Sequence, residues 1–156
     1  MKVELFAPDS ETQPRHWVRH DQAFAMMLRP GSIEWGSKRS ALEKFDYGAG
    51  DLALCHRHVG EWVGLMNVPH LQLSISDAAL MASSDGAYGE VELRPSRKFA
   101  DPRLSAMVAA VDAEMVAGFP SGRLFLDSVE QALAVALVNH YGVRQSSVRT
   151  YRGGLA

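Results

Sequence analysis

Hydrophobic and polar residues alternate over the first hundred positions in short runs, each ended by glycine, proline, aspartate or serine. Phe24, Met26 and Leu28 alternate in this way and stop at an Arg-Pro-Gly turn. Ser76 is placed to cap a short helix over "DAALMASS". The other alternating runs are "SIEWG", "EKFDYGAG", "LALCHRH", "EWVGLM", "HLQLSIS" and "GEVELRP". Several short strands at this spacing predict a small antiparallel β-barrel or sandwich over residues 1–100.

The run "LALCHRH" predicts a strand that continues through its two histidines. Leu52, Leu54, His56 and His58 would share one face, because alternate side chains of a strand point the same way. We expect the leucines to pack inside the barrel and the histidines to lie towards its mouth. Barrel mouths are common small-molecule sites, so the histidines could line a pocket, and a structural or exposed role is the other interpretation.

After residue 100 the apolar spacing becomes that of helices. Asp101 can cap a helix that begins at Pro102, where a missing N–H costs nothing. A Gly-Phe-Pro-Ser-Gly stretch then interrupts the chain, and a second helix is predicted from about Leu124 to Tyr141, with Gly142 as its C-cap. The connection is short, which predicts an antiparallel helical hairpin over residues 101–145. The expected fold class is α+β, a small β-barrel followed by this hairpin.

Composition is that of an ordinary globular chain: 156 residues, 47% hydrophobic and 22% charged, enough for one domain. Cys55 is the single cysteine, so no internal disulfide can form and a reducing cytoplasm is expected. No signal peptide or membrane span is visible. A net charge of −2 argues against direct nucleic-acid binding, and the basic runs at residues 94–98 and 148–152 are short enough to be solvated loops.

The histidine pair resembles half of a metal motif. Gly50, five intervening residues and then His56-Arg57-His58 are similar to the start of the first metal motif of the cupin family of small barrels. Glu61 follows His58 too closely, and the second cupin motif has no counterpart. Two histidines fall short of the three protein ligands that a catalytic metal usually has, so we predict no metal and no cofactor. A free-standing metal-dependent cupin enzyme, an isomerase or dioxygenase, is kept as the alternative.

Other catalytic arrangements are missing from the sequence. It contains no G-x-S-x-G elbow, no P-loop and no G-x-G-x-x-G turn. Cys55 would lie on the strand face opposite the histidines, which separates a nucleophile from its base. The sequence therefore does not predict an enzyme.

The last third carries a more specific signal. "DPRLSAMVAAVDAEMVAGFPSGRLFLDSVEQALAVALVNHYGV" resembles the segment that ends the sensing domain of AraC-type bacterial transcription regulators. The matching positions are Asp101, Pro102, Leu104, Ser121, Gly122, Arg123, Leu124, Asp127, Ser128, Ala132, Leu133, Ala134 and Leu137. "RGGLA" at residues 152–156 is similar to the family's linker, so residues 146–156 are expected to begin a linker to a helix-turn-helix domain that lies outside this chain. The likeness extends more weakly to about residue 20, and "CHRH" departs from it.

The resemblance implies a cupin-like effector-sensing and dimerisation domain of a bacterial, cytoplasmic regulator. We expect a small-molecule effector, a homodimer, and DNA contact only through the absent helix-turn-helix domain. Residues 1–17 could form an N-terminal arm, and a surface strand or disorder is the more ordinary interpretation. A structural or interaction module without a ligand is a third hypothesis.

Two sets of site residues follow from these hypotheses. Core packing is an equally good interpretation for both tryptophans of the first set. The predicted ligand-binding residues are His56, His58, Trp35, Trp62 and Met66. The predicted dimer surface consists of Leu126, Val129, Leu133, Ala136, Leu137 and His140, and a Leu133→Asp substitution is expected to favour the monomer.

Overall fold

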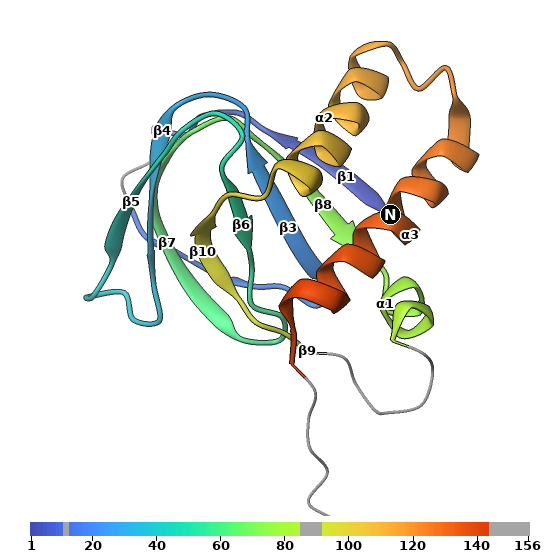
Figure 1. The fold of residues 1–156 in the computed structure, drawn as a ribbon. Coiled ribbons are helices and arrows are strands. Elements are labelled where there is room, and N and C mark those ends of the chain that lie inside the picture. The colour runs from blue at the N-terminus through green and yellow to red at the C-terminus, as the bar shows by residue number, and fades with distance from the viewer. Residues whose placement is uncertain (11–12, 85–91, 144–156) are drawn as a thin grey trace, which may run out of the picture.

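The computed structural model describes residues 1–10, 13–84 and 92–143, and this part of the chain is a mixed fold of mostly strands with three α-helices (Figure 1). The helices are α1 (Asp77–Ser83), α2 (Pro102–Val116) and α3 (Gly122–Tyr141). The strands are β1 (Lys2–Phe6), β2 (Arg15–Val18), β3 (Gln22–Met27), β4 (Gly31–Gly36), β5 (Glu43–Tyr47), β6 (Leu52–Leu54), β7 (Gly60–Asn67), β8 (His70–Ile75), β9 (Glu92–Leu93), β10 (Ser96–Phe99) and β11 (Gly142–Val143).

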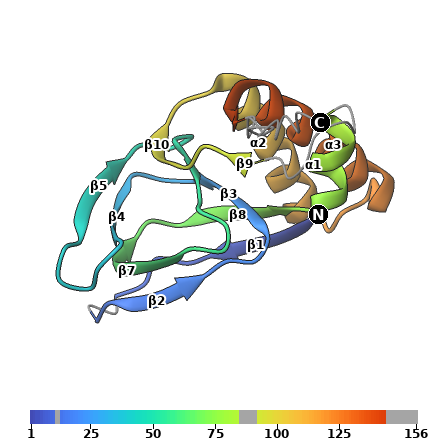
Figure 2. The ribbon, with the colours of Figure 1, turned by 90° about the horizontal axis from the view of Figure 1, so that it is seen from below.

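Two antiparallel sheets and a helical layer build the domain. One sheet has the order β1-β8-β3-β6-β10 and the other β2-β7-β4-β5, while β9 and β11 pair separately. The helices cover the outer face of the five-stranded sheet, and the four-stranded sheet faces its other side (Figures 1 and 2). Within the described residues the strand pairings leave two separate sheets. The predicted helices are present, and each predicted run contributes a strand, although "LALCHRH" does so only as far as Leu54 and "GEVELRP" only over Glu92–Leu93. A closed barrel is not shown.

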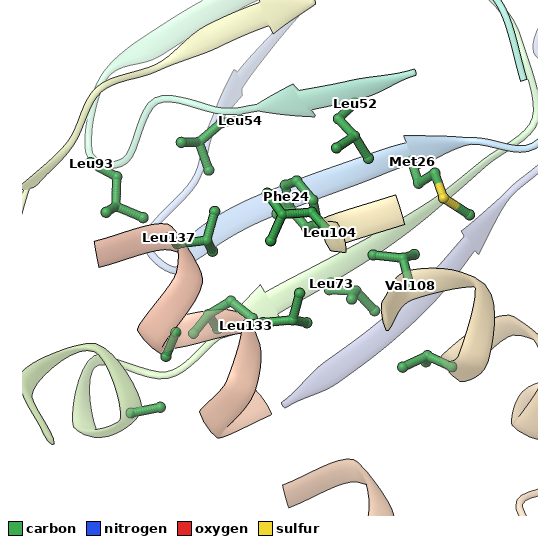
Figure 3. Packing of buried hydrophobic residues seen from close by; sticks show 14 of the residues in the cluster. Phe24, Met26, Leu52, Leu54, Leu73, Leu93, Leu104, Val108, Leu133 and Leu137 are labelled. Atoms are coloured by element: carbon green, nitrogen blue, oxygen red, sulfur yellow. The ribbon is translucent and has the colours of Figure 1, made fainter. Parts of the chain in front are cut away.

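The central strand β3 contributes to two hydrophobic cores, which explains why all six of its residues are buried. Phe24 and Met26 point towards the helices (Figure 3), whereas Ala25 and Met27 point between the two sheets. Alternate side chains of a strand point to opposite faces, so one strand can serve both cores. The core on the helical side includes Leu71, Leu73, Ile75, Leu104, Val108, Val111, Leu133, Ala134 and Leu137.

The same alternation corrects the prediction for the strand "LAL". Leu52 and Leu54 lie in the core beneath the helices (Figure 3). Ala53 belongs instead to the core between the two sheets. The pattern predicted correctly that the two leucines share a face. It did not indicate that this face is covered by the helical hairpin.

The capping signals are confirmed at two of the three helices. The Ser76 hydroxyl accepts a hydrogen bond from the Ala79 amide at 3.3 Å and begins α1. The Asp101 carboxylate accepts from the amides of Arg103 and Leu104 at 3.0 and 3.3 Å and begins α2. Gly142 ends α3 as predicted but with an extended backbone (φ −70°, ψ 134°), because the chain continues directly into β11.

The helical hairpin has the predicted form. Five residues, 117–121, separate α2 from α3, and the two helices run in roughly opposite directions and contact each other (Figure 1). Gly118 and Phe119 reverse the chain with φ values of 80° and 56°, a left-handed conformation that glycine adopts readily and phenylalanine rarely.

At the N-terminus the structure has a strand where an arm was one expectation. β1 forms the edge of the five-stranded sheet and pairs with β8, with Val3 opposite Leu73. The predicted linker at residues 146–156 and the basic run at 148–152 lie outside the described residues. The predicted strand "GEVELRP" is described from residue 92 onwards, where Glu92–Leu93 form β9. No helix in the described part of the chain is long and apolar enough to span a membrane.

Candidate functional site

A buried carboxylate lies between the two sheets, held by two arginines. Glu61 is on β7 and only 3% exposed. Its Oε2 lies 3.2 Å from Nη1 of Arg19, the residue after β2, and its Oε1 lies 2.8 Å from Nη1 of Arg97 on β10. A buried carboxylate needs such partners, because an unpaired charge is costly to remove from water.

Strand pairing explains why these groups meet. Trp17 of β2 stands directly opposite Glu61 of β7 in the antiparallel ladder, so both side chains lie on the same face of the sheet. Arg19 follows two positions after Trp17 and therefore continues on that face. Arg97 belongs to the other sheet: it lies on β10, an edge strand of the five-stranded sheet, and pairs with the carboxylate from there. We call the group Arg19, Glu61 and Arg97 the interior ion cluster.

Tryptophan rings cover the interior ion cluster. The Cζ atoms of Arg19 and Arg97 lie 5.7 and 5.4 Å from the Trp35 ring centroid, and Arg19 Cζ also lies 5.2 Å from that of Trp17. These distances are within the range of cation–π attraction. The indole rings therefore stabilise the guanidinium groups.

Tyr47 connects the cluster to a third element. Its hydroxyl accepts a hydrogen bond from Trp35 Nε1 at 3.1 Å and donates one to the Arg97 carbonyl at 2.5 Å. Burial raises the pKa of Tyr47 to about 12, so the phenol stays protonated and keeps its donor role at physiological pH. This chain of bonds links β4, β5 and β10 around the arginine.

Cys55, which the sequence does not predict to be a nucleophile, is also buried in the structure. It lies beside the cluster, and burial raises the pKa of its thiol above the usual value. A protonated thiol is a poor nucleophile at neutral pH. The chemistry that the cluster supports is binding: two guanidinium groups offer several N–H donors, and one carboxylate accepts.

Trp35 and Met66, two of the predicted ligand-binding residues, lie in the hydrophobic core between the sheets, at 6% and 3% exposure. Both are on the same side as Glu61. Trp35 contacts the interior ion cluster directly through its ring.

His56 and His58 do not lie on a strand face, which corrects that prediction. β6 ends at Leu54, and the following residues form a bend in which His58 has a φ of 62° and is exposed. The His58 amide donates to the Arg19 carbonyl at 2.7 Å, so it is the backbone of this bend that is fixed next to the cluster. The two imidazoles are therefore not aligned by a pleated strand.

The prediction that Trp62 lines the ligand-binding site is also corrected. It neighbours Glu61 on β7 and so points to the opposite face of the sheet, where its ring packs 5.1 Å from His16 and under the Arg39 guanidinium at 5.8 Å. It therefore lies outside the space between the sheets. Among the described residues no group of three or more His, Cys, Asp or Glu side chains could hold a metal ion.

The predicted dimer residues divide into three groups. Leu133 and Leu137 are fully buried against the chain's own sheet, which corrects their assignment to a surface (Figure 3). Leu126, Val129 and Ala136 are partly buried against the same core. His140 is exposed, and its Nε2 lies 3.0 Å from Arg103 Nη1.

Sequence reasoning missed most of the cluster. Arg19, Arg97, Trp17 and Tyr47 were not singled out, and Glu61 was considered only as a metal ligand. The alternation of Arg15, Trp17 and Arg19 along β2 was an available signal, because charged residues repeat on the face that also carries a tryptophan. No sequence spacing links Arg97 to Glu61.

Comparison with solved structures gives a fold match. The crystal structure of an apo ToxT variant from Vibrio cholerae strain SCE256 matches with a TM-score of 0.51 and 11% sequence identity, over 85% of this chain and 52% of that chain. A second ToxT structure from Vibrio cholerae matches with a TM-score of 0.48 and 12% identity, over 88% and 58%. No protein-family model and no curated protein matches the sequence.

This chain thus spans about half of the ToxT chain of the first match. Identity of 11% shows a shared fold and nothing finer. The two antiparallel sheets with their covering helices are the fold of part of ToxT.

Proposed function

We propose that this chain is the effector-sensing and dimerisation domain of an AraC-type transcription regulator, controlling DNA binding by a helix-turn-helix domain outside the described structure. The observation that carries the proposal is the fold shared with ToxT, which is an AraC-family regulator. The resemblance of residues 101–141 to the end of the AraC-type sensing domain supports it independently. A bacterial cytoplasm is the compartment that fits such a regulator.

The effector site of this proposal is the space between the two sheets. Trp35 and Met66 remain from the predicted pocket residues, and Arg19, Glu61 and Arg97 join them. Apolar walls with a few convergent polar groups are typical of small-molecule sites. His56, His58 and Trp62 are left out, because they lie in a bend or on the outer face.

The dimer surface of this proposal is the exposed side of α3. Leu124 and Val135 are 78% and 46% exposed, and three helical turns place them on one side of the helix. Val116 at the end of α2 is 81% exposed and extends the apolar surface at the tip of the hairpin. His140 is exposed near the end of α3, but five residues after Val135 it lies on another side of the helix, so it is not part of this surface.

Sensing requires that the effector bind two arrangements of the regulator with different affinities. β10 is suited to convey such a difference. Arg97 on this strand reaches the interior ion cluster, and Phe99 packs against Tyr141 of α3 with ring centroids 5.0 Å apart. A register shift between Ser96 and Phe99 allows the strand to serve both sides of its sheet.

No observation favours the alternative of a metal-dependent cupin enzyme. That alternative required His56 and His58 to point from one strand face at one ion, and β6 ends before either residue. The structural-module hypothesis gives no reason for a charged cluster between two sheets.

Native mass spectrometry of the purified chain tests the proposal. A metal-free dimer, with a small molecule retained from the expression host, is the expected result. A monomer that carries one stoichiometric transition metal would overturn the proposal and return the histidines to the centre of an enzyme.

A further inference from the structure

The two sheets meet along one pair of edges without a backbone ladder. β5 is an edge strand of the four-stranded sheet and β10 of the five-stranded sheet, and the two strands contact each other. Each is paired on its other side, β5 with β4 and β10 with β6. Over residues 43–47 and 96–99, all of which the structure describes, no backbone–backbone hydrogen bond joins β5 to β10. We call this contact the seam.

Side chains join the two strands of the seam instead. The Tyr47 hydroxyl of β5 donates a hydrogen bond to the Arg97 carbonyl at 2.5 Å. The Lys98 ammonium of β10 donates one in the opposite direction, to the Asp46 carbonyl at 2.6 Å, and lies 6.0 Å from the Tyr47 ring centroid. Two side-chain donors therefore take the place of a strand ladder.

The pairing of β10 with β6 is also incomplete. Ser96 stands opposite Leu54 and Phe99 opposite Leu52, and the register is irregular over the two residues between them. Such an irregularity interrupts the ladder and leaves backbone groups unpaired. Segments with few backbone hydrogen bonds open locally at a lower free energy than the rest of a fold. The middle of β10 is such a segment on both of its sides.

The opposite side of the two sheets is closed in another way. There the chain itself passes from β1 to β2 (Figure 2), and the rings of Phe6 and Trp17 lie with centroids 6.3 Å apart. The Asp9 amide of this connection donates to the Met66 carbonyl of β7 at 2.8 Å. Because covalent continuity and aromatic packing hold this side, the sheets can part at the seam and stay joined here.

Parting at the seam leaves no buried charge without a partner. Glu61 loses Arg97, which belongs to the other sheet, but keeps Arg19, which follows the strand paired with β7. The Arg97 side chain is already 28% exposed and gains water when it leaves the carboxylate. The large cost of an isolated buried ion is therefore avoided.

We propose that the seam opens in the folded protein, with the two sheets parting between β5 and β10, and that the hydrogen bonds of Tyr47 and Lys98 hold the closed state. The open seam is the route by which water reaches the interior ion cluster and Trp35, whose Nε1 bonds to the Tyr47 hydroxyl. This inference concerns the motion of the fold, and it holds whether or not the chain is a sensing domain.

Two groups behind the seam report its opening in the purified chain. Cys55 is the single cysteine and is buried beside the cluster, so its reaction with N-ethylmaleimide, followed by mass spectrometry, measures access to that space. Hydrogen exchange of the Trp35 indole N–H, followed by NMR, measures it independently. We expect both rates to depend only weakly on urea below the unfolding transition, because a local opening exposes little surface.

Variants of two lysines separate the seam from its surroundings. Lys98→Met should raise both rates by about tenfold, because it removes a hydrogen bond from a charged donor across the seam. Lys98→Arg keeps a charged donor and should stay close to the wild type. Lys44→Met is the matched control: Lys44 is exposed on β5 itself and lies 3.6 Å from the Asp46 carboxylate without crossing the seam. It should change neither rate.

Three results would overturn the proposal. The first is a urea dependence of both rates as steep as that of global unfolding. The second is an effect of Lys98→Met no larger than that of Lys44→Met. The third is faster Cys55 labelling without faster Trp35 exchange, which would assign the opening to the bend after β6. Circular dichroism checks folding, and if Lys98→Met does not fold, Tyr47→Phe replaces it with Cys55 labelling as the readout.

Discussion

At the residue scale, single buried polar groups join elements that are far apart in the chain. Tyr47 connects Trp35 to the Arg97 carbonyl, fifty positions away in sequence. Glu130 of α3 accepts from the Ser76 amide at 2.8 Å and from the Met1 amine at 3.0 Å. Each such group is satisfied by partners that only the folded chain provides, so its removal leaves a buried donor or acceptor unpaired.

Tyr47→Phe tests one of these connections. The substitution removes the hydroxyl, leaving Trp35 Nε1 and the Arg97 carbonyl without their shared partner. We expect the free energy of unfolding to fall by about 1–3 kcal/mol. Urea denaturation measures this loss. Ser32→Ala, which removes an exposed hydrogen bond to Asp46, is the control and should cost much less.

His70 predicts a pH dependence of stability. Burial lowers the pKa of His70 below its usual value of 6.5; its Nδ1 lies 3.1 Å from the Val68 carbonyl and its ring stacks on Phe6 at 4.8 Å. The unfolded chain therefore binds this proton more readily than the folded chain does. The contribution of neutral His70 to stability is fully present above about pH 6.5 and is lost as the pH falls below that value.

Urea midpoints at pH 7.5, 6.5 and 5.5 check this expectation, with His70→Gln as the comparison. The variant should show a flatter dependence over this interval. An identical decline in both proteins would assign the effect to other groups.

At the scale of elements, the ends of the helices follow local signals that are legible in the sequence. Ser76 and Asp101 cap α1 and α2 as predicted, because capping depends on the amides two and three positions later. The burial of a helix face depends instead on what packs against it. Leu133 and Leu137 were assigned to the outside for this reason, and they lie in the core.

Asp101→Ala should destabilise the protein by about 0.5–2 kcal/mol, the usual cost of losing an N-cap. Burial alone would raise the pKa of Asp101, but its hydrogen bonds with the Arg103 side chain and the amides of Leu104 and Arg103 hold the pKa below its usual value. The charged form is therefore the stabilising one, and its contribution is lost as the pH falls below about 4. Thermal melts of wild type and variant should converge at acidic pH.

Leu133→Asp and Val135→Asp separate the core of α3 from its surface. Leu133 is fully buried, so a carboxylate there should cost at least about 3 kcal/mol of stability, whatever the oligomeric state. Val135 is 46% exposed, so its variant should remain folded and shift the dimer towards the monomer. Denaturation and native mass spectrometry give the two readouts. A folded Val135→Asp dimer of unchanged affinity would remove this face from the interface.

At the scale of the whole molecule, the sequence predicted the kinds of elements better than their arrangement. The alternating runs became strands and the apolar stripes became α2 and α3, because both periodicities are local properties. The cover of Leu52 and Leu54 by helices, and the meeting of Arg19, Glu61 and Arg97, depend on contacts between distant segments. Nothing near these residues in sequence encodes those contacts, which is why the site was only partly predicted.

The edge position of β1 has a consequence for synthesis of the protein on the ribosome. Val3 pairs with Leu73, seventy positions later, and the described sheet offers β1 no other strand partner. At ordinary translation rates the first strand therefore waits unpaired for a time on the order of seconds. Lys2 and Glu4 alternate with its apolar residues and form an ion pair at 2.8 Å in the finished fold. In the nascent chain the same charges discourage the waiting strand from pairing with a neighbouring copy.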